Sequence, residues 1–237
     1  PKRLPKTVKF KIDETKPTDQ YARLYASDVV DAVNALSLPR YGLGNYVPAS
    51  PHQPPPPAEA KLLQDLSRAG KRLMGFCRTN LFKRLESSGH AFLQSIERHI
   101  LRNYVFLYAI ENSQPLPIGT QDADVLDTRI DDEDREDNLF DDDENGEGPP
   151  PAQAASLRTG ADFKRCATEI YAEYAAQYKR RFKWLSSGLF IKTLEKDLRA
   201  DSEALLMLLQ RCGEWDAAKD AKLDALEQKA LRLQERV

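Results

Sequence analysis

The feature that most constrains the fold is residues 78–108, where a one-sided set of mostly apolar residues recurs at helical spacing. The set consists of Leu81, Leu85, Phe92, Ile96, Ile100, Asn103 and Leu107. With 3.6 residues per turn, this spacing predicts one long central helix. Ser87, Ser88 and Gly89 interrupt its good helix formers, and we expect the helix to continue through them. The alternatives are a break with Ser88 as N-cap, or small residues that admit a close neighbour.

Three arginines fall on another side of this predicted helix. At about 100° per residue, Arg84, Arg98 and Arg102 lie within about 40° of one another if the helix is unbroken. Such a face has two interpretations. It is either a solvated surface or a surface that meets phosphate groups.

The charges divide unevenly along the chain. The formal net charge is −2, yet residues 122–147 hold 14 acidic side chains against Arg129 and Arg135. The rest of the chain therefore carries a net charge of +10. A basic body with an acidic insert favours a polyanionic partner, but it carries no information about base sequence.

Helical spacing recurs in six further segments, which are residues 21–36, 58–69, 163–185, 189–198, 202–212 and 219–236. We expect the second to stop or bend near Gly70, and Gly213 to close the fifth. Alternation in residues 7–12 predicts one short N-terminal strand. Residues 54–57 predict a polyproline spacer, with a ligand for a proline-reading domain as the alternative.

These elements predict an all-α fold, a helical bundle around one long central helix with at most one short N-terminal strand. The predicted divisions are residues 1–47, 48–57, 58–119, 120–158 and 159–237. Residues 1–47 hold an N-terminal strand, helix and loop, residues 48–57 a proline-rich spacer, and residues 58–119 the central long-helix region. Residues 120–158 form an acidic flexible insert, and residues 159–237 hold the C-terminal helices. Because the chain begins with Pro1, we expect it to be part of a longer protein.

The motifs of several kinds of catalytic or metal site are missing from the sequence. It has no GxxxxGK[ST] phosphate loop, and the spacing of its three histidines and three cysteines suggests no metal site. We expect structural roles for the histidines and reduced, buried thiols in a cytoplasmic protein. No apolar run approaches the roughly 20 residues of a membrane span, so no membrane contact is expected.

Several short segments of the sequence resemble segments of one protein family, and they occur in the same order as in that family. They are RLPKTVKF, LSLPRYGLGNYV, NLFKRLESSGHAF, KWLSSGLFIKTLEKDLRADSEALLMLL and DAKLDALEQKAL, of which KRLESSGHAF is the most specific. Together they resemble the middle part of SWI/SNF-type, superfamily-two helicase-like ATPases. The nearest likeness is to bacterial helicase-domain proteins that often carry a phospholipase-D-like module.

The resemblance implies a helical linker or protrusion between two RecA-like lobes of an ATP-dependent helicase-like or translocase protein. ATP and Mg²⁺ would then be cofactors of the parent protein, a nucleoside-triphosphate hydrolase. The residues that bind them belong to the lobes and have no matching position in this chain. The expected partners are those lobes and nucleic acid, with DNA preferred; the oligomeric state stays open.

Eight basic residues are the candidates for contact with nucleic acid. They are Lys83, Arg84, Arg98, Arg102, Lys179, Arg180, Arg181 and Lys183. The last four have an ordinary alternative, because basic side chains in a final helical turn complement the helix dipole. A second interpretation of the whole chain is a helical protein-interaction module whose final apolar stripe docks a partner.

A third hypothesis is that the acidic insert competes with nucleic acid for the basic surface, in which case deleting residues 122–147 would tighten the binding of nucleic acid.

Overall fold

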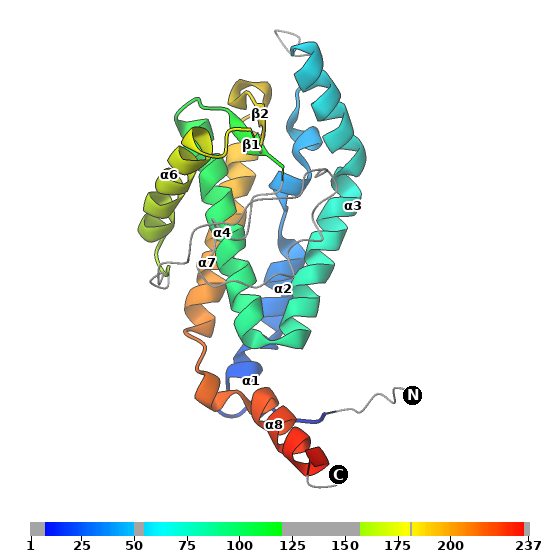
Figure 1. Cartoon of the computed structure of the whole chain (residues 1–237), viewed down its shortest axis with the longest axis vertical. Helices are drawn as coiled ribbons and strands as arrows, with labels where there is room; N and C mark the ends of the chain where they lie inside the picture. The colour runs from blue at the N-terminus through cyan, green and yellow to red at the C-terminus, as the bar shows by residue number, and fades with distance from the viewer. Residues whose placement is uncertain (1–7, 50–54, 120–156, 181, 235–237) are drawn as a thin grey trace.

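The computed structural model describes residues 8–49, 55–119, 157–180 and 182–234, which fold into a bundle of helices. Helices α3 (Pro57–Ser87) and α4 (Gly89–Glu111) form a long antiparallel hairpin. Helices α6 (Gly160–Ala176) and α7 (Thr193–Cys212) pack against α4 (Figure 1). The predicted all-α bundle is confirmed. Residues 50–54 and 120–156, which hold part of the predicted proline-rich spacer and most of the predicted acidic insert, lie outside the described residues.

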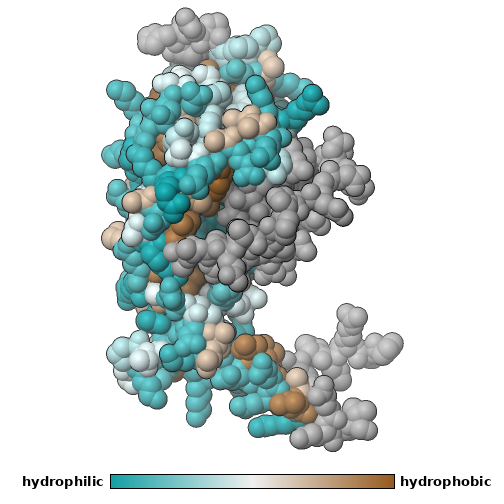
Figure 2. Space-filling model, turned by 60° about the vertical axis from the view of Figure 1, so that its left-hand side comes forward, coloured by the Kyte–Doolittle hydropathy of each residue, from teal (hydrophilic) through white to brown (hydrophobic). Residues whose placement is uncertain are grey.

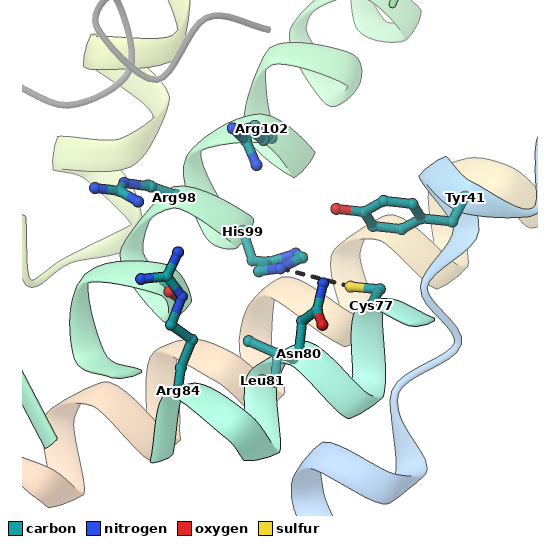
Figure 3. A pocket seen from close by; sticks show the side chains of 9 residues that line it. Tyr41, Cys77, Asn80, Leu81, Arg84, Arg98, His99 and Arg102 are labelled. Atoms are coloured by element: carbon teal, nitrogen blue, oxygen red, sulfur yellow. Dashed lines mark hydrogen bonds between the residues drawn. The ribbon is translucent and has the colours of Figure 1, made fainter. Parts of the chain in front are cut away.

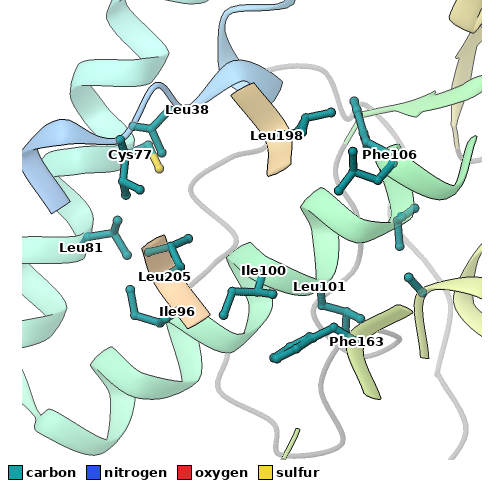
Figure 4. Packing of buried hydrophobic residues seen from close by; sticks show 14 of the residues in the cluster. Leu38, Cys77, Leu81, Ile96, Ile100, Leu101, Phe106, Phe163, Leu198 and Leu205 are labelled. Atoms are coloured by element: carbon teal, nitrogen blue, oxygen red, sulfur yellow. The ribbon is translucent and has the colours of Figure 1, made fainter. Parts of the chain in front are cut away.

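The core forms around the apolar face of α4, as its helical spacing predicts. Phe92, Ile96 and Ile100 are fully buried on this helix. Ile96 and Ile100 lie beside Leu205 of α7, and Phe163 of α6 lies beside Leu101 in the next part of the helix (Figure 4). Helix α4 therefore contributes buried residues in almost every turn, because other elements surround it.

The predicted continuous helix is wrong, because the chain turns back at Ser88. Its backbone is extended at φ −152° and ψ 132°, and its hydroxyl accepts a hydrogen bond from the Ala91 amide at 3.4 Å. Gly89 follows, where a Cβ atom would lie 2.3 Å from the Trp215 ring and 2.6 Å from Leu24 Cδ1. The two alternatives, a capped break and a close neighbour, occur together. Residues 78–108 thus belong to two helices.

Of the stop or bend expected near Gly70, the stop is wrong, since α3 runs through Gly70 to Ser87. Gly70 instead lets the loop of residues 36–47 lie on α3. A Cβ atom there would be 3.2 Å from the Tyr41 carbonyl oxygen, and one on Gly44 would be 2.5 Å from Ser67 Cα. Two 3₁₀ turns, η1 (Pro39–Tyr41) and η2 (Leu43–Tyr46), shape this loop.

Carboxylates of α7 hold the same loop from its other side. Asp201 is buried and accepts hydrogen bonds from the amides of Ser37, at 2.8 Å, and Leu38, at 2.7 Å. Asp197 accepts one from the Tyr46 hydroxyl at 2.8 Å. Burial raises the pKa of Asp201, although both amides act against that rise. The loop is therefore fixed between α3 and α7.

Strands form at other positions than the predicted one. Residues 8–12 have no secondary structure in the described part of the chain. A small antiparallel sheet joins β1 (Leu116–Ile118) to β2 (Lys183–Leu185), with Leu116 opposite Leu185. The helix predicted over 163–185 accordingly ends at Ala176, the last residue of α6.

Three other predicted helix boundaries can be compared with the structure. The helix predicted over 21–36 is two, α1 (Gln20–Leu24) and α2 (Ser27–Ala35). The segments 189–198 and 202–212 join in α7, which starts only at Thr193. Gly213 does end α7, with φ at +70°.

Helix α8 (Ala221–Gln234) leaves the bundle at the end where α4 begins (Figure 1). Asp220 accepts hydrogen bonds from the Tyr21 hydroxyl at 3.1 Å and from the Leu223 amide at 2.9 Å. Lys222 donates to the carbonyl oxygens of Glu86 and Ser87. The start of α8 is thereby fixed to the turn between α3 and α4. Hydrophobic side chains gather on its surface (Figure 2).

Candidate functional site

A pocket between α3 and α4 brings the three predicted arginines together. Its volume is about 40 Å³. Arg84 extends from α3 toward Arg98 of α4, and Arg102 lies one turn further along α4 (Figure 3). Cys77 of α3, His99 of α4 and Tyr41 of the loop line the remaining side. None of the described residues that line it is an aspartate or a glutamate.

The hairpin places these arginines, although a continuous helix was expected to do so. Arg84 lies one turn before the end of α3, and Arg98 and Arg102 lie four residues apart on α4. Side chains at that spacing share one helix face. Since α3 and α4 are antiparallel neighbours, Arg84 meets this face from the opposite helix.

The arginines are more buried than a solvated surface would require. Arg98 is 3% exposed and Arg102 is 8% exposed, while Arg84 is partly buried. Like charges held together in a setting of low dielectric repel one another strongly. A negatively charged group beside a guanidinium accepts charge-assisted hydrogen bonds from it.

Arg40 is a fourth guanidinium close to this pocket; it contacts His99 but does not line the pocket itself, and sequence reasoning missed it. It comes from the loop, donates from Nε to Asn103 Oδ1 at 2.9 Å and lies 5.1 Å from the centroid of the Tyr41 ring. Burial lowers the pKa of Arg40, and Arg102 acts in the same direction. No helical periodicity marks a loop residue, and the phrase LSLPRYGLGNYV contains Arg40 without setting it apart.

His99 lies between Arg40 and Cys77. Arg40 Nη2 is 3.4 Å from His99 Nδ1, and Cys77 Sγ is 3.6 Å from His99 Nε2. Burial, followed by Arg40, Arg102 and Arg98, holds the pKa of His99 well below its ordinary value of 6.5. An arginine only donates, so Nδ1 accepts and the single proton of neutral His99 belongs on Nε2, facing the sulfur. The imidazole is neutral at pH 7.

The other predicted basic residues lie elsewhere. Lys83 is exposed beside Arg84 and does not line the pocket. Lys179 and Arg180 are exposed in the turn after α6, Lys183 is exposed on β2, and Arg181 lies outside the described residues. This turn is at the end of the bundle where α4 ends, whereas Arg84 is near the end where α4 begins (Figure 1). The eight candidates thus separate into two groups.

The other cysteines differ from Cys77 in their surroundings. Burial raises the pKa of Cys212 to about 11, and burial also raises the pKa of Cys166 on α6. Among the residues that the structure describes, no three histidine, cysteine, aspartate or glutamate side chains are grouped to hold a metal ion.

Comparisons of the chain with models of protein families, with curated proteins and with solved structures gave no match. Within the described ranges, no helix combines the length and apolar character needed to span a membrane.

Proposed function

We propose that this chain is the helical linker or protrusion of an ATP-dependent helicase-like or translocase protein, and that it contacts nucleic-acid phosphates through Arg84, Arg98 and Arg102. The resemblance of the phrases around KRLESSGHAF supports the first part. The observation that carries the second is the convergence of three arginines from two helices on one pocket. Guanidinium groups bind phosphates in forked geometry, which suits such a site.

The α3–α4 hairpin suits the mechanical part of this role. Helix α3 has 31 residues, so at 1.5 Å per residue it is about 46 Å long. It packs on α4, and α4 packs on α6 and α7. A packed hairpin of this length acts as a rigid arm, which would couple phosphate contact to the movement of two lobes. ATP, Mg²⁺ and catalysis are assigned to the lobes of the parent protein.

Fluorescence anisotropy with labelled duplex DNA at low salt tests the contact. Changing Arg84, Arg98 and Arg102 together to glutamine should weaken binding about tenfold or more, because three phosphate contacts are lost. The matched control changes Lys61, Arg68 and Arg72 to glutamine, since these are exposed on α3 away from the pocket. The control should bind as the unchanged protein does. Equal losses in both variants would remove the pocket from the proposal.

A second candidate function is a helical interaction module that docks another copy through α8. Leu223, Leu226 and Leu231 are 41%, 46% and 59% exposed on this helix, which supports it. Light scattering should then show a mass that rises with concentration, and Leu226→Glu should abolish the rise. Met207→Glu, at an exposed position of α7, is the control and should preserve it. A monomer at every concentration would contradict self-docking. The flanking coding sequence separates the two candidates, because only the motor requires a phosphate loop upstream.

A further inference from the structure

We infer that Cys77 is a reactive thiolate that a hydroperoxide oxidises to a sulfenic acid, with His99 and Arg40 as its positioning residues. This inference goes beyond the proposed function and does not depend on it. It rests on three observations, which are a hydrogen-bond donor directed at the sulfur, a positive charge behind that donor, and an opening to solvent.

The sulfur of Cys77 faces a side chain that donates to it. Cys77 Sγ is 3.6 Å from His99 Nε2, and the two side chains approach each other from α3 and α4 (Figure 3). Arg40 Nη2 lies 3.4 Å from His99 Nδ1, and because a guanidinium only donates, the proton of neutral His99 is on Nε2. The sulfur is therefore the acceptor. A thiolate accepts a hydrogen bond more strongly than a thiol does, so this donor favours the ionised sulfur.

Arg40 supplies the positive charge behind this donor. Its Nε donates to Asn103 Oδ1 at 2.9 Å, which fixes the guanidinium in place. Burial lowers the pKa of Arg40, whereas Cys77 acts to raise it. This electrostatic interaction is mutual, so the charge of Arg40 favours a negative charge on the sulfur. Reactive thiolates occur in electropositive surroundings of this kind.

Small molecules reach the sulfur from the pocket. Cys77 is 8% exposed and lines the pocket together with His99, and the pocket is open to solvent. Cys166 and Cys212 do not line it, and burial raises the pKa of each of these two thiols. A raised pKa leaves less thiolate at pH 7, and the thiolate is the nucleophile. Oxidation should therefore be selective for Cys77.

The oxidation consumes one hydroperoxide and one proton. The thiolate attacks the terminal oxygen of the hydroperoxide, so that an S–O bond forms and the O–O bond breaks. Two electrons pass from the sulfur to the departing oxygen, which takes a proton from water and leaves as an alcohol, or as water when the oxidant is hydrogen peroxide. The product is a sulfenic acid, the first and reversible stage of cysteine oxidation. His99 and Arg40 keep the sulfur ionised and form no bond in this step.

The pH profile of alkylation by iodoacetamide, followed by peptide mass spectrometry, tests whether the sulfur is ionised. The midpoint of such a profile depends on the ionisation of the thiol and not on how easily the reagent reaches it. For Cys77 in the folded protein, the midpoint should lie about one pH unit or more below that of Cys77 in the urea-unfolded chain. The midpoints of Cys166 and Cys212 should lie above their unfolded values. A Cys77 midpoint at or above its unfolded value would overturn the inference.

Three variants test the positioning residues by the same profile. His99→Phe removes the donor, so the Cys77 midpoint should rise toward its unfolded value. His90→Phe, at an exposed position in the first turn of α4, is the control and should leave it unchanged. Asn103→Ala is a milder change that releases Arg40 from its anchor and should raise the midpoint as well.

The Cys212 midpoint shows whether each variant stays folded, because it falls to its unfolded value if the protein unfolds. An unchanged Cys77 midpoint in folded His99→Phe would overturn the role of His99. The same result in folded Asn103→Ala would overturn that of Arg40.

Treatment with hydrogen peroxide followed by dimedone, which traps sulfenic acids, tests the oxidation itself. At pH 7, Cys77 should be labelled about tenfold more than Cys166 or Cys212, because a midpoint one pH unit lower gives about ten times as much thiolate. Peptide mass spectrometry measures the three labels in one sample. Equal labelling of the three cysteines, or no label on Cys77, would contradict a peroxide-reactive thiolate at this pocket.

Discussion

Burial, together with its arginine neighbours, keeps the imidazole of His99 neutral. Burial and its arginine neighbours lower its pKa in the folded protein, while the unfolded chain has the ordinary value of 6.5. Below pH 6.5 the unfolded chain therefore binds a proton that the folded protein does not bind. The stability contributed by neutral His99 is fully present above pH 6.5 and is lost as the pH falls.

This difference gives a measurable pH dependence. As the pH falls from 7.5 to 5.5, which is one pH unit below the ordinary pKa of histidine, His99 should lower the free energy of unfolding by an amount on the order of 1 kcal/mol. Urea unfolding at both pH values should show a smaller loss in His99→Gln than in the unchanged protein. The matched control is His90→Gln, because His90 is exposed on the first turn of α4. An unchanged pH dependence in His99→Gln would show that His99 is not kept neutral.

The arginines of the pocket show how far the position of a single side chain can be predicted from the sequence. Arg84, Arg98 and Arg102 were grouped correctly, but for the wrong reason, since the grouping assumed one helix. Their convergence comes from the hairpin. Arg40 could not be placed, because its position depends on Asp201, which fixes the preceding loop from a helix more than 160 residues away.

The turn between α3 and α4 is the element that decides the architecture. Ser87, Ser88 and Gly89 stand between strong helix formers, so local propensity alone favours continuity. Tertiary contact decides otherwise, because Trp215 packs against Gly89 from a segment far along the chain. The same holds at residues 183–185, where pairing with β1 replaces the helix that their spacing predicted.

Two glycine-to-alanine changes test the role of this turn. Gly89→Ala should lower the free energy of unfolding by about 1–3 kcal/mol, because its Cβ atom would overlap Trp215 and Leu24. Gly75→Ala should raise it by about 0.5–1 kcal/mol, because Gly75 lies in the interior of α3 with no atom within 4 Å of the new Cβ. Urea unfolding measures both. Equal effects of the two changes would contradict a tight contact at Gly89.

The whole molecule combines a rigid hairpin, a small arginine pocket and a projecting terminal helix. The all-α class followed from helical spacing, because core packing needs that spacing whatever the connections are. The path of the chain did not follow, because it depends on contacts between distant segments. The pocket likewise depends on contacts between distant segments, since Cys77, His99 and Tyr41 come from three elements.

The salt dependence of duplex DNA binding tests the central claim most directly. Each phosphate contact contributes about 0.9 to the slope of log affinity against log salt concentration. Changing Arg84, Arg98 and Arg102 to glutamine should therefore reduce the slope by about 2.7, while changing Lys61, Arg68 and Arg72 should leave it as it is. The same slope for the pocket variant and the unchanged protein would contradict phosphate contact at this pocket.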